Sequence, residues 1–221
     1  MINISKLISA SLVLLSLSLP VQSAAANEGD LCAPFENAKL DQSLIATMLE
    51  AATDGHLYQI KNDSSKMGFC VNSPVGMVNG NFKDFNGGIA LNQANKQTIV
   101  KANVGSLETD VPFTEKMIKS EQFFDAKSFP DLMFISSEFE WLSETHGVLK
   151  GKLSMHGVTK SVAFYVKITE TEPSLDGSRN ILVKATTTVL RSEFDMNALS
   201  PAVSDKVNIC MSIEAEKYQA I

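Results

Sequence analysis

Apolar and polar residues alternate along much of this chain, and this alternation restricts the fold more than any other feature. In the segment VNICMSIEA every second residue is apolar: Val207, Ile209, Met211, Ile213 and Ala215. A helix would mix the two sets of residues around its axis, whereas a strand places them on opposite faces. The segment is therefore predicted to be a strand with one buried face.

The same pattern recurs from Tyr58 onward. It is clear in SKMGFCV, in residues 149–155 and in residues 162–168, and further strands are expected near 76–82, 87–92, 98–105, 132–140 and 180–190. Turn-forming stretches such as KDFNGG and EPSLDGSRN separate these segments. About eight antiparallel strands with one apolar side each can close into an up-and-down barrel, which leaves no exposed edge. The predicted fold class is therefore all-β.

One helix is expected before the strands. Apolar residues there recur every four positions: Leu40, Leu44, Met48 and Ala52. This spacing predicts an α-helix from about Gln42 to Thr53, after a cap at Asp41 and before a stop at Gly55. Its apolar face is expected to cover the outside of the sheet.

A second interruption is the segment DVPFTEKMIKSEQFFDAKSFP, residues 110–130. Thr114 can cap a short helix, and Phe123 and Phe124 follow it. Such a segment between two strands is either a lid on one end of a barrel or a connection that completes the core. The sequence leaves both interpretations open.

The first 26 residues have the features of a cleavable signal peptide. Lys6 precedes the apolar run LISASLVLLSLSL, and small residues follow it, so that cleavage is expected after Ala25 or Ala26. The run is shorter than the stretch of about 20 residues that a membrane-spanning helix needs, so no stable membrane insertion is expected. The predicted organisation is a signal peptide at 1–26, an N-terminal arm and helix at 27–57 and a barrel domain at 58–221, in a protein exported to the periplasm.

Charge and motifs exclude several classes of function. The formal net charge of −6 argues against nucleic-acid binding, which requires a basic surface. The sequence also has no P-loop, GxGxxG, GxSxG or HExxH motif. No catalytic residue and no metal site are predicted.

Several segments resemble the YceI-like family over roughly residues 58–217. The most specific are FFDAKSFPDLMF and LSMHGVTKSV, together with GNFKDFNGGIAL and LRSEFDMNALSPAVSDKVNICMSIEAEK. The resemblance implies an exported, lipocalin-like barrel that holds a long isoprenoid, a polyprenyl chain or a quinone tail, and no enzymatic activity. One departure is the stretch KNDSSKMGF, which lacks the histidine that many members have just before the first barrel strand.

The composition is compatible with an apolar cavity. The chain has 12 phenylalanines and 9 methionines, which provide an adaptable apolar lining but also fill ordinary cores. With the resemblance, the prediction is a non-covalent isoprenoid or quinone ligand, no other cofactor, and a homodimer left open as the assembly. The residues predicted to contact the ligand are Met67, Phe69, Val71, Phe82, Val104, Phe123, Phe124, Phe134, Met155, Phe164 and Met211.

The histidines support two competing interpretations. His156 precedes Gly157 between two predicted strands, a position typical of a hairpin turn. Alternatively, His156 or His146 serves an enzyme that acts on a lipid-like or small substrate. A third hypothesis is a packed barrel that only binds other proteins through its outer helix.

Three cysteines allow one disulfide in an oxidising compartment. Cys70 and Cys210 fall on the outward sides of the first and last barrel strands, which are neighbours in an up-and-down barrel. A Cys70–Cys210 disulfide is the preferred prediction. A link from Cys32 to either strand is the alternative.

Overall fold

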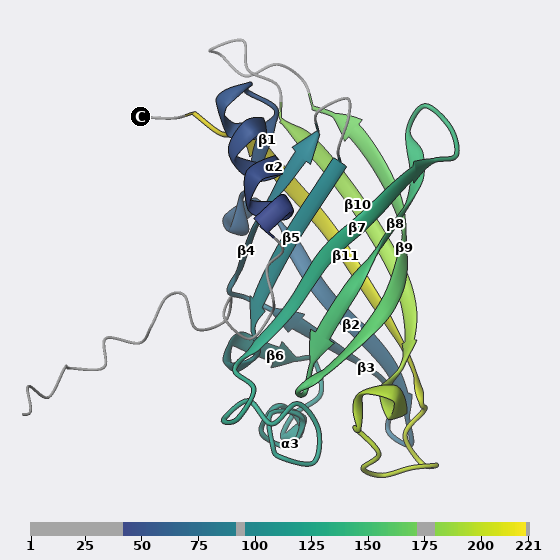
Figure 1. Ribbon diagram of the computed structural model, residues 1–221. Coiled ribbons are helices and arrows are strands. Elements are labelled where there is room, and N and C mark those ends of the chain that lie inside the picture. The colour runs from purple at the N-terminus through teal and green to yellow at the C-terminus, as the bar shows by residue number, and fades with distance from the viewer. Residues whose placement is uncertain (1–41, 92–95, 172–179, 220–221) are drawn as a thin grey trace, which may run out of the picture.

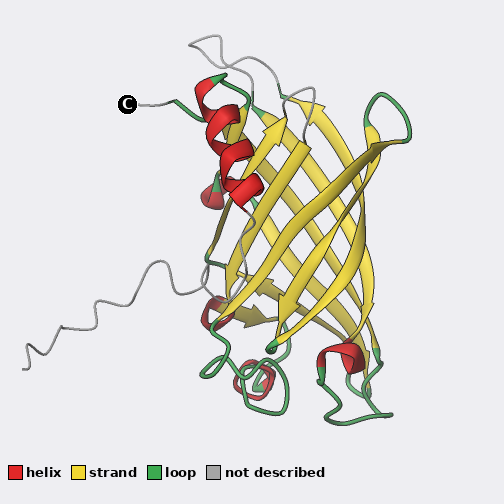
Figure 2. Ribbon diagram, in the orientation of Figure 1, coloured by secondary structure: helices red, strands yellow, loops and turns green. Residues whose placement is uncertain are grey.

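Antiparallel strands account for most of the described chain, which comprises residues 42–91, 96–171 and 180–219 of the computed structural model. The strands are β1 (Leu57–Ile60), β2 (Lys66–Ser73), β3 (Gly76–Phe82), β4 (Phe85–Leu91), β5 (Lys96–Asn103), β6 (Leu107–Thr109), β7 (Asp131–Trp141), β8 (His146–Met155), β9 (Val158–Glu170), β10 (Ile181–Leu190) and β11 (Lys206–Lys217). The helices are α2 (Gln42–Thr53) and α3 (Thr114–Ile118), and three 3-10 turns are η1 (Asn62–Ser64), η2 (Val104–Ser106) and η3 (Arg191–Phe194). Together they form a barrel with α2 on its outside and α3 at one end (Figures 1 and 2).

The eleven strand segments occupy eight positions around the barrel. Three positions each consist of two consecutive segments: β1 with β2, β3 with β4, and β5 with β6. The position of β3 and β4 lies between the other two: β1 and β5 both pair with β4, and β2 and β6 both pair with β3. The long strand β11 pairs with β10 along one edge and with both β2 and β1 along the other, which closes the barrel. The predicted all-β, lipocalin-like antiparallel barrel is confirmed.

The three breaks in these positions lie side by side, and side chains replace the missing strand hydrogen bonds. The amide of Asn62 donates to the carbonyl of Lys83 at 2.9 Å, and its oxygen accepts the backbone N–H of Phe85 at 3.1 Å. The Oγ of Ser106 accepts the backbone N–H groups of Lys83 and Asp84 at 3.2 and 2.9 Å. The wall can therefore bend here while its backbone polar groups stay paired.

Beyond this bend, α3 and the segment after it close one end of the barrel. Among the described strands β6 pairs only with β3, whereas β7 pairs with β5 up to Asn103. The chain between them forms α3, which contacts β6, and Phe123 and Phe124 are both buried. Figure 1 shows this segment at the lower end of the barrel. The lid interpretation is therefore favoured over a simple connection.

Helix α2 packs on the outside of the barrel, mainly against β4. Its buried residues are Leu44, Thr47 and Ala51, while Ile45 and Leu49 are exposed. The predicted every-fourth-residue stripe was wrong at its end, because a period of 3.6 brings Ala51 rather than Ala52 toward the sheet. Leu40 and the cap at Asp41 lie outside the described residues. Within the described ranges, neither helix reaches the length and apolarity that a membrane crossing requires.

The predicted Cys70–Cys210 disulfide is absent, and neither thiol is bonded to another described cysteine. The strands are neighbours, as expected, but Cys70 lies opposite Asn208 and Cys210 lies opposite Gly68. This two-residue offset makes the cysteines diagonal neighbours at about 7–8 Å, beyond the usual Cα separation of about 4.4–6.8 Å for a disulfide. Cys32, the alternative partner, lies outside the described residues.

Candidate ligand-binding cavity

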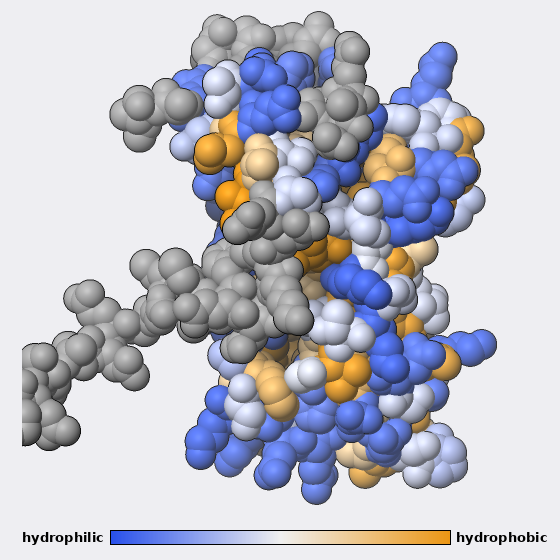
Figure 3. Space-filling view, viewed as in Figure 1, coloured by the Kyte–Doolittle hydropathy of each residue, from blue (hydrophilic) through white to orange (hydrophobic). Residues whose placement is uncertain are grey.

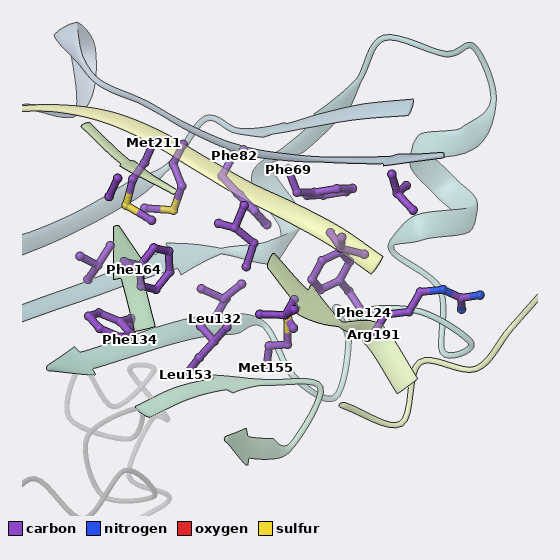
Figure 4. A pocket seen from close by; sticks show the side chains of 18 of the residues that line it. Phe69, Phe82, Phe124, Leu132, Phe134, Leu153, Met155, Phe164, Arg191 and Met211 are labelled. Atoms are coloured by element: carbon purple, nitrogen blue, oxygen red, sulfur yellow. The ribbon is translucent and has the colours of Figure 1, made fainter. Parts of the chain in front are cut away.

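A cavity of about 380 Å³ lies inside the barrel. Side chains from β1–β5 and β7–β11 contribute to its wall, and α3 and the loop after η3 contribute to one end (Figure 4). Its volume lies within the range of about 300–1,000 Å³ that is typical of small-molecule sites. The alternation of each strand explains the lining, because the apolar face of every strand points inward.

Ten of the eleven predicted contact residues line this cavity. They are Met67, Phe69, Val71, Phe82, Phe123, Phe124, Phe134, Met155, Phe164 and Met211. Val104 does not line it, although it is buried in the core. The prediction extended strand alternation to Val104, but β5 ends at Asn103 and η2 begins with Val104, so its side chain packs at the bend instead.

Sequence reasoning missed much of the aliphatic wall and most of one end. The missed wall residues include Ile60, Leu132, Leu153, Val183 and Ile213, and the same alternation would have identified them. Val75, Leu199 and Val203 also line the cavity, but they lie in a turn and a loop. No periodic signal marks residues of that kind.

Phenylalanine rings form two groups along the cavity. Toward the α3 end, the Phe124 ring lies 5.8 Å from that of Phe69 and 6.1 Å from that of Phe82, between centroids. Farther from α3, the rings of Phe134 and Phe164 meet edge to face at 5.1 Å (Figure 4). Phe124 thus connects the lid segment to the barrel wall.

Buried glycines leave room for phenylalanine rings against the wall. Gly80 lies opposite Phe69 in the register of β2 and β3, and a Cβ at Gly80 would lie 2.4 Å from the Phe69 ring. The same close approach occurs in two further pairs, Gly147 with Phe139 and Gly151 with Phe134. Because no side chain intervenes, each ring can lie over the glycine backbone instead of filling the bore.

Arg191 is a buried cation at the α3 end of the cavity (Figure 4). Its side chain is 5% exposed, and the guanidinium donates to the carbonyls of Met196, Ala198, Val203 and Ser204. No carboxylate of the described chain lies within ion-pair distance of it. Arg191 therefore holds the loop that supplies Met196, Leu199 and Val203 to the cavity.

Asp205 fixes the other side of the same loop. Its carboxylate accepts the backbone N–H and the hydroxyl of Ser192, both at 2.8 Å. These hydrogen bonds, the backbone one first, lower the pKa of Asp205 below its ordinary value, and the charge of Arg191 adds to the effect.

His156 is a turn residue, as its sequence context predicted. His156 and Gly157 have φ values of 51° and 73° and form the two-residue connection between β8 and β9. The Nδ1 of His156 lies 2.9 Å from the carbonyl oxygen of Phe194. His146 begins β8 on the outer surface, next to Lys167. Neither histidine lines the cavity.

The cavity wall offers little chemistry beyond apolar contact. Among the described residues, its lining contains no His, Cys, Asp, Glu or Tyr, and its polar members are Ser73, Lys96, Thr98, Thr114 and Arg191. The described part of the chain also contains no group of three or more metal-ligating side chains. The arrangement suits binding of an apolar molecule.

Comparisons with known proteins agree with this geometry. The family model of the YceI-like domain matches residues 58–215. A UPF0312 protein of Pseudomonas putida is 29% identical over 145 residues, which cover 64% of this chain and 75% of the relative. A UPF0312 protein of Enterobacter sp. is 28% identical over 145 residues, or 64% of this chain and 74% of the relative.

Solved structures show the same fold. A YceI protein of Campylobacter jejuni has a TM-score of 0.59 and 25% identity, covering 63% of this chain and 85% of its own. BcnA of Burkholderia cenocepacia has a TM-score of 0.63 and 18% identity, covering 70% and 98%. A domain of Saccharophagus degradans described as polyisoprenoid binding has a TM-score of 0.57 and 13% identity, covering 73% and 98%.

Proposed function

The chain belongs to the YceI-like family, and we propose that it holds a long-chain isoprenoid, such as a polyprenyl chain or quinone tail, in the cavity of its barrel. The role is sequestration or transport of that lipid. The observation that carries the proposal is the apolar cavity of about 380 Å³, lined from every strand position of a closed barrel.

The shape of the barrel favours a long ligand. The 12 residues of β11 span about 40 Å along the strand, which corresponds to about 30 Å of barrel height at a usual strand tilt. The lining runs from Leu91 and Ile168 near one end to Val75 and Leu199 at the other. An extended, flexible hydrocarbon fits such a cavity better than a compact polar substrate.

The energetics also favour a hydrocarbon chain. Each buried CH₂ group contributes about 0.8 kcal/mol, so several isoprene units provide roughly 10 kcal/mol before the costs of association and ordering. A polar substrate would leave its hydrogen-bonding groups unpaired against this wall, which costs free energy. The wall therefore favours long hydrocarbon chains over polar ligands.

A structural neighbour described as a polyisoprenoid binding domain supports the same ligand class, although its 13% identity by itself shows only the fold. The enzyme hypothesis receives no such support. That hypothesis relied on His156 or His146, and the described lining of the cavity contains neither of them and no carboxylate.

Export to the periplasm is part of the proposal and is based on the signal-like residues 1–26. N-terminal sequencing of the protein from its own cells tests it, with cleavage after Ala25 or Ala26 as the expected result. A mature protein that still begins at Met1 would contradict export by a cleavable signal.

Native mass spectrometry tests the ligand. The protein is purified from its own cells without detergent, and its organic extract is analysed for lipids. We expect a bound mass that corresponds to an isoprenoid. A ligand-free protein that also fails to bind polyprenols and quinones in titration would refute the proposal.

A further inference from the structure

Exposed large apolar side chains gather at the α3 end of the barrel. We call four of them the apolar rim: Val75, Phe113, Met117 and Leu199, which are 72%, 96%, 39% and 52% exposed. They come from three separate segments, namely the β2–β3 turn, the region of α3 and the loop after η3, which all lie toward the lower end of the barrel in Figure 1. The rim is therefore a feature of the tertiary structure.

The apolar rim is continuous with the cavity. Val75, Met117 and Leu199 line the cavity and are also exposed, and Phe113 directly precedes Thr114, another lining residue. At these three residues the apolar lining of the cavity reaches the outer surface, next to the polar lining residues Ser73 and Thr114. An apolar ligand in the cavity would meet apolar side chains up to the surface.

Two members of the rim have unusual backbone conformations. Phe113 and Leu199 have φ values of 66° and 57°, in the left-handed region that normally favours glycine or asparagine. Both side chains are exposed, and that of Leu199 also lines the cavity in the loop that Arg191 holds. Backbone strain that presents an apolar side chain to solvent indicates a role at a surface.

Charges of both signs lie on the segments that carry the rim. Lys119 and Glu115 form an ion pair at 2.7 Å, and Asp110 accepts hydrogen bonds from the backbone N–H and amide of Asn79. Lys116 and Glu121 are exposed on the α3 segment and have no ion-pair partner among the described residues, so exposed charges of both signs remain there. The net charge of −6 disfavours an anionic surface.

We propose that the apolar rim docks on the surface of a lipid bilayer rich in zwitterionic phospholipid. Phe113 and its neighbours enter the interfacial region, and an isoprenoid passes between the bilayer and the cavity without crossing water. Exposed apolar patches of this kind mark protein or membrane contacts, and continuity with an apolar cavity favours the membrane. The inference rests on the proposed function and adds the surface at which the lipid is exchanged.

Vesicle flotation tests the docking surface. The full-length mature protein is mixed with phosphatidylcholine–phosphatidylethanolamine vesicles, and the substitution is Phe113→Asn. Asparagine tolerates the left-handed conformation, so the variant is expected to fold. Removal of one inserted aromatic ring is expected to weaken vesicle binding about tenfold. Leu142→Asn, at an exposed apolar residue of the opposite end, is the matched control and is expected to have no effect.

The single tryptophan allows a positional measurement. Trp141 ends β7, far along the barrel from α3, so its fluorescence is expected to be unaffected by vesicles that contain brominated lipid. The double variant Phe113→Trp/Trp141→Phe places the only tryptophan in the rim, and its fluorescence is expected to be quenched. Quenching of Trp141 instead would overturn the proposal.

The controls separate this inference from the proposed function. Affinity for a short polyprenol in vesicle-free solution is expected to be the same for the wild type and Phe113→Asn, because Phe113 does not line the cavity. Retained polyprenol binding without flotation refutes only the docking surface. If the wild type does not bind polyprenol, the proposed function is refuted.

The oligomeric state provides a further control. A homodimer in lipid-free solution that Phe113→Asn dissociates would also overturn the docking surface, because the rim would then bind another protein chain.

Discussion

At the scale of single residues, Arg191 shows how a buried charge can shape an apolar cavity. Its guanidinium replaces water with four backbone carbonyls, and those carbonyls belong to the loop that closes one side of the cavity end. Arg191 can therefore shape the cavity without contacting a ligand. It acts by positioning Met196, Leu199 and Val203.

Replacement of Arg191 by methionine is expected to lower the free energy of unfolding by about 3 kcal/mol, because several buried carbonyls lose their donor. Urea denaturation measures the change. Arg191→Lys is expected to be destabilised as well, since one ammonium group cannot reach the same four acceptors. If Arg191→Lys were as stable as the wild type, a positive charge alone would be sufficient to hold the loop.

Asp205 predicts a dependence of stability on pH. Its pKa is lower in the folded protein than in the unfolded chain, so its stabilising contribution is complete above the unfolded pKa and is lost as the pH falls through the folded pKa. The stability difference between the wild type and Asp205→Asn is therefore expected to be largest near neutral pH and to shrink below about pH 4. Urea midpoints of both proteins at several pH values provide the measurement. A difference that grows on acidification would contradict the assigned hydrogen bonds.

At the scale of elements, the period of the sequence was enough to predict most strands and the inward faces that make the cavity. The period could not predict where strands bend. Val104 was predicted to contact the ligand and does not line the cavity, because η2 begins where β5 ends. The period also could not predict the register of β11 against β2. That register depends on the pairing along both whole strands, and it separates Cys70 from Cys210 by two residues. The residues of the apolar rim follow no period, so the sequence did not predict that three separate segments would place them at one end of the barrel.

The glycine beneath Phe69 provides a test of how neighbouring strands keep the bore open. Gly80→Ala introduces a Cβ 2.4 Å from the present position of the Phe69 ring, so the ring must move toward the cavity. We expect the free energy of unfolding to fall by about 1–3 kcal/mol and polyprenol affinity to fall about tenfold, as for a loss of about 1.4 kcal/mol.

Gly88→Ala on β4 is the matched control for Gly80→Ala. The nearest atom to a Cβ at Gly88 is a leucine methyl at 3.4 Å, an ordinary contact, so little change is expected in stability or affinity. Calorimetric titration and urea denaturation compare the two variants. Equal affinities for Gly80→Ala and Gly88→Ala would show that the Phe69 ring does not limit the space for the ligand.

At the scale of the whole molecule, a closed wall, a lid segment and an apolar interior together form a container for an apolar chain. Closure pairs β11 with β1 and β2 and leaves the interior accessible mainly through the ends. The sequence predicted this container through its alternation and its family resemblance. Alternation and composition alone could not predict that the interior is hollow, because the same phenylalanines and methionines could have filled it; that expectation came from the resemblance.

The most direct test of the hollow barrel is the affinity for a series of polyprenols of increasing length, measured in the absence of vesicles. Each added isoprene unit buries more apolar surface until the cavity is full, so the affinity is predicted to rise with chain length and then to level off. An affinity that is undetectable throughout, or that does not change with chain length, would contradict an interior that holds the chain.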